Sequence, residues 1–296
     1  MLPKRRILSK KIIEWIKKHL ALIKKNKKPN KINNPKPKIK PKKINIPETK
    51  KINEYKHLLK INYVKPRYNS IIPLHVYMCW QTKRLPPLMQ QNYNNLVAGN
   101  PKMTFHLYDD DDCREFIKNH FPEDVLNAFD TLIPGAYKAD LWRYCVMYIN
   151  GGIYMDIKFQ CVNGFKFITL TEKEHFVRDR PQNSIYNALI VSLPRNEIMR
   201  KCIYEIVENV KNKYYGNSNL YPTGPKLIGK YFTNEQRNSL SMYFKITNIK
   251  NKFKDSYIVQ NDRIILRYYK GYRDEQNKTQ QTKHYSELWN NKNIYN

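Results

Sequence analysis

Residues 138–160 read KADLWRYCVMYINGGIYMDIKFQ, and after the opening lysine this largely apolar stretch keeps four charged side chains. Asp140 and Arg143 follow a helical spacing, so they share one helix face. Asp156 and Lys158 follow a strand spacing beyond two glycines, so they share one strand face. Buried charges are costly unless each has a partner. The pattern leaves two interpretations open: an internal ion pair, or a cleft where Asp140 binds sugar hydroxyls and Arg143 binds phosphate or a hydroxyl.

The strand after the glycines has two different faces. The apolar face, predicted to point into the core, consists of Ile153, Met155 and Ile157. The other face presents Tyr154, Asp156 and Lys158, which are a ring, a carboxylate and an ammonium. Open α/β sheets bind ligands at the carboxyl ends of their strands. A ligand site is therefore favoured over a plain surface edge.

Strand and helix patterns alternate from residue 69 onward. The predicted strands are 71–80, 103–108, 153–158 and 187–194, and the predicted helices are 85–100, 109–121, 136–149 and 197–215. This alternation predicts an α/β domain with a mostly parallel central sheet. The last fifty residues are predicted to form short strands and loops.

Three strings carry a family resemblance: ADLWRYCVMYINGGIYMDIK, IPLHVYMCWQTKRLPP and TGPKL. Together they resemble the sugar-binding region of family-32 glycosyltransferases, which is related to that of the glucosylating clostridial toxins. The resemblance covers about residues 71–232. It implies a GT-A-type, Rossmann-like domain that moves a hexose from a nucleotide-diphosphate sugar to a hydroxyl of a glycan, lipid or protein acceptor, with retention of anomeric configuration.

The same resemblance implies roles on the donor side. Trp80 matches the aromatic residue that stacks on the nucleotide base, although a core tryptophan is the alternative. Asp140 and Arg143 match the pair that holds the donor sugar hydroxyls. Tyr154 matches the ring beside the diphosphate. Asp156 matches the first acid of the DxD motif, next to the ribose and the metal-bound diphosphate.

Two further segments match more loosely. Thr223 and Gly224 match a loop on the acceptor side, and a helix cap by Thr223 explains the same pattern. His284, Ser286 and Trp289 fall where related enzymes bring a C-terminal loop over the diphosphate.

Lys158 departs from the family motif, which has a second carboxylate at this position for Mn²⁺ or Mg²⁺. Divalent cations of this kind prefer oxygen ligands, and an ammonium repels them. Three explanations are open. Lys158, aided by Arg143, replaces the ion; or Asp156 and groups such as His284 still hold a metal; or the chain is a relic that only binds. We favour retained activity and leave metal use open.

A second acidic run, YDDDDC at 108–113, comes at a predicted helix start. Consecutive acids point in different directions there, so they do not converge on an ion. We expect Asp110 or Asp111 to cap the helix, with an acceptor-side role as the alternative.

The N-terminal part differs sharply in composition. Residues 1–60 contain 21 basic and 3 acidic side chains, which gives +18 of the formal net charge of +29. We predict a basic amphipathic helix at 7–25 within a disordered Lys-, Pro- and Asn-rich segment, 1–68, followed by the catalytic domain, 69–296. The tail fits a solubilising tether or a contact with an anionic membrane surface. Nucleic-acid binding ranks last, because no recognised module accompanies the charge.

The cysteines are scattered and lack CxxC pairs, which is typical of buried thiols in a reducing compartment: Cys79, Cys113, Cys145, Cys161 and Cys202. Neither a signal peptide nor a membrane span is recognisable. The sequence therefore predicts a cytoplasmic glycosyltransferase that the tail can bring to a membrane surface. The alternatives are a non-catalytic protein that binds sugar nucleotides or glycans, and a protein whose tail defines its function.

Overall fold

The computed structural model describes residues 61–181, 183–249 and 253–296. The predicted basic helix at 7–25 lies outside the described residues, as does most of the predicted N-terminal segment. Within the described ranges, no helix combines the length and the apolar character that crossing a bilayer requires. The domain boundary between residues 68 and 69 stays a prediction.

A four-stranded central sheet positions the residues of interest. Its order is β2 (Thr104–Tyr108), β1 (His75–Cys79), β3 (Gly152–Met155) and β6 (Leu189–Ser192). β1 pairs in parallel with β2 and with β3, whereas β6 pairs antiparallel to β3. The prediction of an α/β domain with a mostly parallel central sheet is confirmed.

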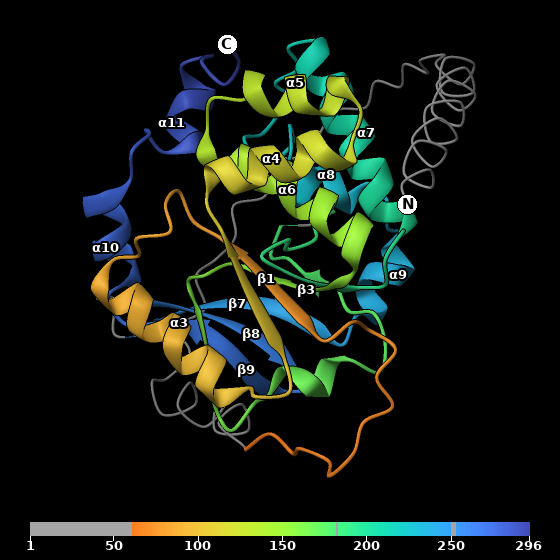
Figure 1. The fold of residues 1–296 in the computed structure, drawn as a ribbon, viewed down its shortest axis with the longest axis vertical. Helices are drawn as coiled ribbons and strands as arrows, with labels where there is room; N and C mark the ends of the chain where they lie inside the picture. The colour runs from red at the N-terminus through yellow and green to blue at the C-terminus, as the bar shows by residue number, and fades with distance from the viewer. Residues whose placement is uncertain (1–60, 182, 250–252) are drawn as a thin grey trace, which may run out of the picture. The chain divides into compact units, whose positions relative to one another are not determined.

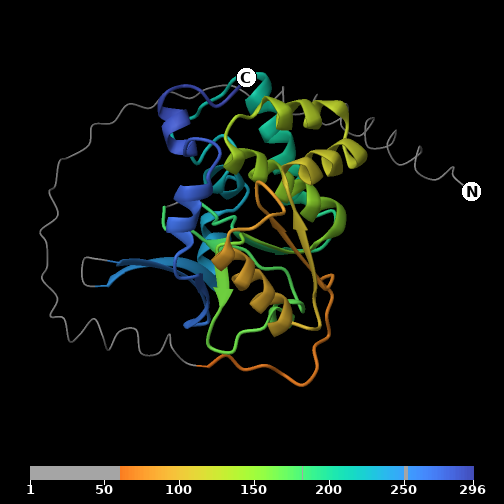
Figure 2. The same cartoon turned by 60° about the vertical axis from the view of Figure 1, so that its left-hand side comes forward.

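Each face of this sheet has its own apolar core. One core joins Tyr77 and Tyr154 to the helices α4 to α8 and α11, and the other joins Val76 and Ile153 to α3 and a second sheet. In both views α4 to α7 gather at one end of the molecule and β7 to β9 at the other (Figures 1 and 2). The helices are α3 (Pro87–Gly99), α4 (Asp110–His120), α5 (Glu123–Thr131), α6 (Gly135–Asn150), α7 (Glu197–Lys211), α8 (Pro225–Gly229) and α9 (Asn234–Ser239), with a short 3₁₀ helix, η3 (Phe167–Leu170).

The second sheet was not predicted from the sequence. Its order is β4 (Phe159–Cys161), β9 (Arg263–Tyr268), β8 (Phe253–Gln260), β7 (Met242–Ile249) and β5 (Val177–Arg178). The expectation of short strands and loops at the C-terminal end was wrong, because β7 and β8 are long and pair along their whole length. Two helices that follow them, α10 (Tyr272–Thr279) and α11 (Tyr285–Asn290), were also missed.

The start of α4 corrects a second expectation. Asp109, not Asp110 or Asp111, is the N-cap: its carboxylate accepts a bond from the backbone N–H of Asp112 at 2.9 Å. The Asp112 side chain accepts in return from the N–H of Asp109 at 3.1 Å. The helix therefore begins at Asp110, earlier than a cap at Asp110 or Asp111 would allow, and the reciprocal pair satisfies two free backbone donors.

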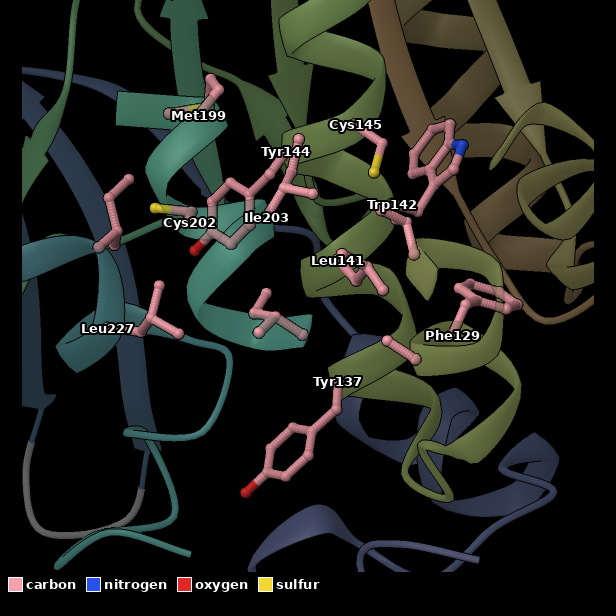
Figure 3. Packing of buried hydrophobic residues seen from close by; sticks show 14 of the residues in the cluster. Phe129, Tyr137, Leu141, Trp142, Tyr144, Cys145, Met199, Cys202, Ile203 and Leu227 are labelled. Carbon is pink, nitrogen blue, oxygen red and sulfur yellow. The ribbon is translucent and has the colours of Figure 1, made fainter. Parts of the chain in front are cut away.

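Helix α6 is buried on almost every side, as predicted. Figure 3 shows Tyr144 pointing toward Cys202 and Ile203 of α7, while Trp142 lies on another side of α6. The Tyr144 hydroxyl accepts a hydrogen bond from the Asn187 amide at 2.9 Å. Tyr144 therefore belongs to the core, although it shares a helix face with Asp140 by spacing.

The two glycines fix the turn from α6 into β3. Gly151 has φ +61° and Gly152 has φ +100°, a region that side chains other than glycine rarely adopt. A Cβ on Gly152 would lie 2.8 Å from the carbonyl oxygen of His75. Glycine at this point lets β3 start next to β1 directly after α6 ends.

Candidate active site

Helix α6 and the carboxyl end of β3 bring five predicted residues into one place. Asp140, Arg143, Tyr154, Asp156 and Lys158 all line a single cleft of about 880 Å³. Ion pairs link the four charged members in the order Asp140, Arg143, Asp156, Lys158, and we call them the charged cluster. The structure therefore contains both features that the sequence left as alternatives: internal ion pairs and an adjoining cleft.

Asp140 is 7% exposed, and both of its carboxylate oxygens have partners. Oδ1 lies 3.2 Å from the Arg143 guanidinium and accepts from the Asn187 amide at 2.9 Å. Oδ2 accepts from the Thr223 hydroxyl at 2.7 Å. Burial raises the pKa of Asp140, while these donors and Arg143 act in the opposite direction.

Thr223 does not cap helix α8, which was one of the two interpretations of this residue; the other was a loop on the acceptor side. The N-cap residue of α8 is Gly224, without a side-chain capping bond. Thr223 is 1% exposed and donates to Asp140 instead. A Cβ on Gly224 would lie 3.1 Å from Asp140 Oδ2, so this segment packs closely against the carboxylate.

Arg143 joins the two carboxylates of the charged cluster. Its Nη2 lies 3.2 Å from Asp140 and 3.5 Å from Asp156, and its Nη1 donates to the Asn187 carbonyl at 2.9 Å. The guanidinium also lies 4.5 Å from the centre of the Tyr154 ring. Burial opposes the charged form, but Tyr154 and both carboxylates hold the pKa of Arg143 well above its usual value.

Asp156 lies just beyond β3 and is held by three groups. The Tyr154 hydroxyl donates to Oδ1 at 2.6 Å, and the Lys158 ammonium lies 2.6 Å from Oδ2. Burial raises the pKa of Asp156, but Lys158 and Arg143 outweigh it and leave the pKa below its ordinary value. Asp156 is therefore a carboxylate at neutral pH.

Lys158 is enclosed by aromatic rings. Its ammonium lies 5.3 Å from the ring centre of Tyr268 and 5.4 Å from that of Tyr186, and its side chain is 15% exposed. Burial lowers the pKa of Lys158, but Asp156 more than offsets this and raises the pKa well above its usual value. The ammonium is therefore a fixed positive charge at the cleft.

These residues do not fit a divalent cation. Both carboxylate oxygens of Asp156 already have partners, Tyr154 and Lys158. The position that holds the second acid of a DxD motif is occupied by Lys158, whose ammonium repels a cation. In the part of the chain that the structure describes, no cluster of three or more His, Cys, Asp or Glu side chains could hold a metal. Mn²⁺ and Mg²⁺ prefer several oxygen ligands, which this set does not offer.

The remaining predicted site residues separate into two groups. Trp80, Gly224 and His284 line the cleft. Ser286 and Trp289 are not among its lining residues. Trp289 donates to the Tyr215 carbonyl at 2.8 Å and packs against the core beside α6, because α11 is a helix there and not an open loop.

Sequence reasoning missed three groups that build this site: the Asn187 amide, the Thr223 hydroxyl as a partner of Asp140, and Arg273 on α10. Asn187 bonds to Asp140 and to Tyr144 at once. Arg273 lines the cleft from a helix that was not predicted. Acidic residues in the first turn, Asp274 and Glu275, were a usable signal for that helix.

The charged cluster lies at the carboxyl end of a parallel strand, which is where open α/β sheets bind their ligands. Residues 86–176 match the family described as glycosyltransferase sugar-binding region containing DXD motif. This match covers part of the region in which the sequence resembles family-32 glycosyltransferases, and it agrees with that resemblance.

Within the aligned segments, two curated relatives are about a quarter identical to this chain. An uncharacterized glycosyltransferase of Acanthamoeba polyphaga mimivirus is 27% identical over 193 residues, which is 58% of this chain and 70% of the relative. A mannosyl phosphorylinositol ceramide synthase of Saccharomyces cerevisiae is 25% identical over 54% of this chain and 42% of its own length. The chain thus spans less than half of the yeast relative.

Among solved structures, a PaToxG glycosyltransferase has a TM-score of 0.42 and 18% sequence identity. The similarity covers 54% of this chain and 67% of that protein.

Proposed function

We propose that the protein transfers a hexose from a nucleotide-diphosphate sugar to a hydroxyl of a glycan, lipid or protein acceptor, with retention of anomeric configuration. One observation carries this proposal. Asp140, Arg143, Tyr154, Asp156 and Lys158, which all lie within the family match at 86–176, converge on one cleft. Five side chains from two elements lining one cavity fit a binding role better than an ion pair that only supports the fold.

The chemistry has one main electrostatic demand. The nucleoside diphosphate leaves with added negative charge, and a nearby positive charge must stabilise it as it forms. We assign this role to Lys158, with Arg143 fixing the position of Asp156. An ammonium has three N–H donors, and Asp156 takes one of them. Binding that aligns donor and acceptor supplies the rest of the catalysis.

Asp140 is assigned to the donor sugar. Its carboxylate is fixed by Thr223 and Asn187, so it is held ready to accept bonds from sugar hydroxyls without reorganising. Trp80 and His284 line the same cleft and are assigned to the base and the diphosphate. Gly224 is assigned to the acceptor side.

The relatives suggest where to begin with substrates. The yeast relative is named for mannosyl transfer to an inositol-containing ceramide, and an inositol phosphoceramide mannosyltransferase of Schizosaccharomyces pombe is 28% identical over 31% of this chain. We therefore place mannose donors and lipid acceptors first in a panel. Glucose and galactose donors complete it.

The test incubates the full chain with this panel and measures released nucleoside diphosphate and glycosylated product. We expect turnover with at least one donor, and an Asp156→Asn variant that is slower by about a hundredfold or more. Asp130→Asn is the matched control, because Asp130 pairs with Arg114 on the surface. Donor binding without turnover would favour a non-catalytic binding protein. The anomeric configuration of the product, read by NMR, decides retention.

We assign the basic tail to an anionic membrane surface, because residues 1–60 carry +18 of the formal net charge of +29. Deleting these residues is expected to abolish binding to vesicles that contain phosphatidylserine and to leave turnover intact. Loss of turnover would show that the catalytic domain begins earlier than residue 69.

A further inference from the structure

The charged cluster is electrically balanced. It contains the carboxylates of Asp140 and Asp156 and the cations of Arg143 and Lys158, and every cation lies within 3.5 Å of a carboxylate. The four charges cancel. A nucleoside diphosphate that enters the cleft therefore meets hydrogen-bond donors here but no net positive charge, and further positive charge has to come from elsewhere on the wall.

Four other cationic side chains line the cleft: Lys138, Arg180, Arg273 and Lys283. Lys283 forms an ion pair with Glu287 at 2.9 Å. Lys138 lies close enough to Asp110 for its charge to lower the pKa of that carboxyl, against the larger effect of burial. Neither of these lysines is free of a carboxylate.

The two arginines, Arg180 and Arg273, differ in whether a carboxylate lies beside them. Arg180 follows Asp179, whose pKa it lowers against the larger effect of burial. Arg273 Nη1 donates to the neutral side-chain oxygen of Gln276 at 2.9 Å. Among the described residues, no carboxylate forms an ion pair with Arg273. Its positive charge is therefore the least compensated on the cleft wall.

Arg273 stands next to the charged cluster. Its guanidinium carbon lies 5.4 Å from the ring centre of Tyr268, and the Lys158 ammonium lies 5.3 Å from the centre of the same ring. A second ring, Tyr272, lies 5.5 Å from the guanidinium. Both cations thus border one tyrosine, on neighbouring parts of the cleft wall.

The helix that carries Arg273 is fixed to the body of the domain. The Glu275 carboxylate accepts from the backbone N–H groups of Leu88 and Met89, at 2.7 and 2.9 Å, at the start of α3. It also accepts from the Tyr269 hydroxyl at 2.9 Å. The two backbone donors are ones that a helix start leaves free, so α10 is held to a distant part of the chain, the start of α3. Arg273 is therefore presented from a rigid support.

We propose that Arg273 binds the diphosphate of the donor and supplies the net positive charge that the charged cluster lacks. The assignment of Arg273 rests on the proposed function, in which the nucleoside diphosphate is the leaving group. A guanidinium is suited to this task, because its planar fork donates two parallel bonds to phosphate oxygens.

Arg273 would assist the transfer of the sugar from the diphosphate to the acceptor hydroxyl. The bond between the anomeric carbon and the phosphate oxygen breaks, and the electron pair stays on that oxygen. The acceptor oxygen forms the new bond to the anomeric carbon, and its proton passes to the departing diphosphate or to solvent. Arg273 stabilises the charge that collects on the diphosphate.

The experiment titrates the full chain with UDP, GDP, UMP and GMP by calorimetry. Arg273→Gln is expected to weaken the diphosphate that binds best by about tenfold to a hundredfold, and to affect the monophosphate less. Arg273→Lys should recover part of the affinity. Lys278→Gln is the matched control, since Lys278 is exposed on the same helix and does not line the cleft.

Two failures can be told apart. If the unmodified protein binds a diphosphate and Arg273→Gln binds it equally well, this inference is wrong while the proposed function stands. If the unmodified protein binds neither diphosphate and turns over no donor, the proposed function fails and this inference falls with it. Weakening by Lys278→Gln as large as that by Arg273→Gln would also overturn it, because the effect would then reflect only total charge.

Discussion

The charged cluster and α10 hold positive charge in opposite ways. Arg143 and Lys158 are buried and paired with carboxylates, whereas Arg273 is exposed and bonded to a neutral amide. Buried charge is tolerated only when it is compensated, so the cluster can position a ligand but offers little net attraction. Exposed charge costs little to leave unpaired. The comparison teaches that positioning and net attraction are divided between two parts of one cleft.

The largest loss of stability is expected when one carboxylate of the charged cluster is removed. Asp156→Asn leaves Lys158 buried without a full carboxylate partner, so the free energy of unfolding should fall by about 3–5 kcal/mol. Asp130→Asn, which breaks the surface pair with Arg114, should cost about 1 kcal/mol or less. Urea unfolding followed by circular dichroism measures both. Equal losses would mean that the cluster behaves like a surface pair.

Removing both partners should cost less than removing one. In the double variant Asp156→Asn, Lys158→Met, an apolar chain of similar length replaces the ammonium between Tyr186 and Tyr268. We expect the double variant to be more stable than Asp156→Asn by about 1–3 kcal/mol. Losses that simply add in the double variant would contradict a compensated pair.

A smaller effect is expected from His175, a buried imidazole whose pKa is not raised by a nearby carboxylate. Burial, with a smaller contribution from Lys173, lowers the pKa of His175 to about 4, whereas Asp156 raises that of Lys158. Between about pH 6.5 and pH 4, His175 binds a proton in the unfolded state but stays neutral in the folded state. Stability should therefore fall as the pH drops from about 6.5 toward 4.

The contribution of His175 amounts to about 1–2 kcal/mol by pH 5. It is measured as the change in unfolding free energy between pH 7 and pH 5. His175→Gln should show a smaller change than the unmodified protein. An identical pH dependence in the two proteins would show that His175 is protonated in the folded state.

Local pattern was enough to predict the centre of the site. The helical spacing of Asp140 and Arg143 and the glycine pair each depend on a few neighbouring residues, and α6 formed as expected. The predicted strand 153–158 was too long, because β3 ends at Met155 and leaves Asp156 and Lys158 in the turn that follows. Burial of α6 also followed directly from its apolar composition.

The rest of the site depends on contacts between distant residues. Thr223 reaches Asp140 across 83 positions, and Glu275 reaches Leu88 across 187. No short pattern encodes such a bond. The second sheet was missed for the same reason, since β4 in the middle of the chain pairs with β9 near the C-terminal end. Arg273 could not be assigned because its place on the cleft wall follows from that sheet.

The central claim is that two cations of the protein act at the donor diphosphate in place of the ion that the DxD motif binds elsewhere: Lys158 as a hydrogen-bond donor and Arg273 as the source of net positive charge. The most direct test compares turnover of the best donor in EDTA and in added Mn²⁺, after the protein has been stripped of metal. The account predicts the same rate in both conditions. Loss of turnover in EDTA, with full recovery on adding Mn²⁺, would contradict it.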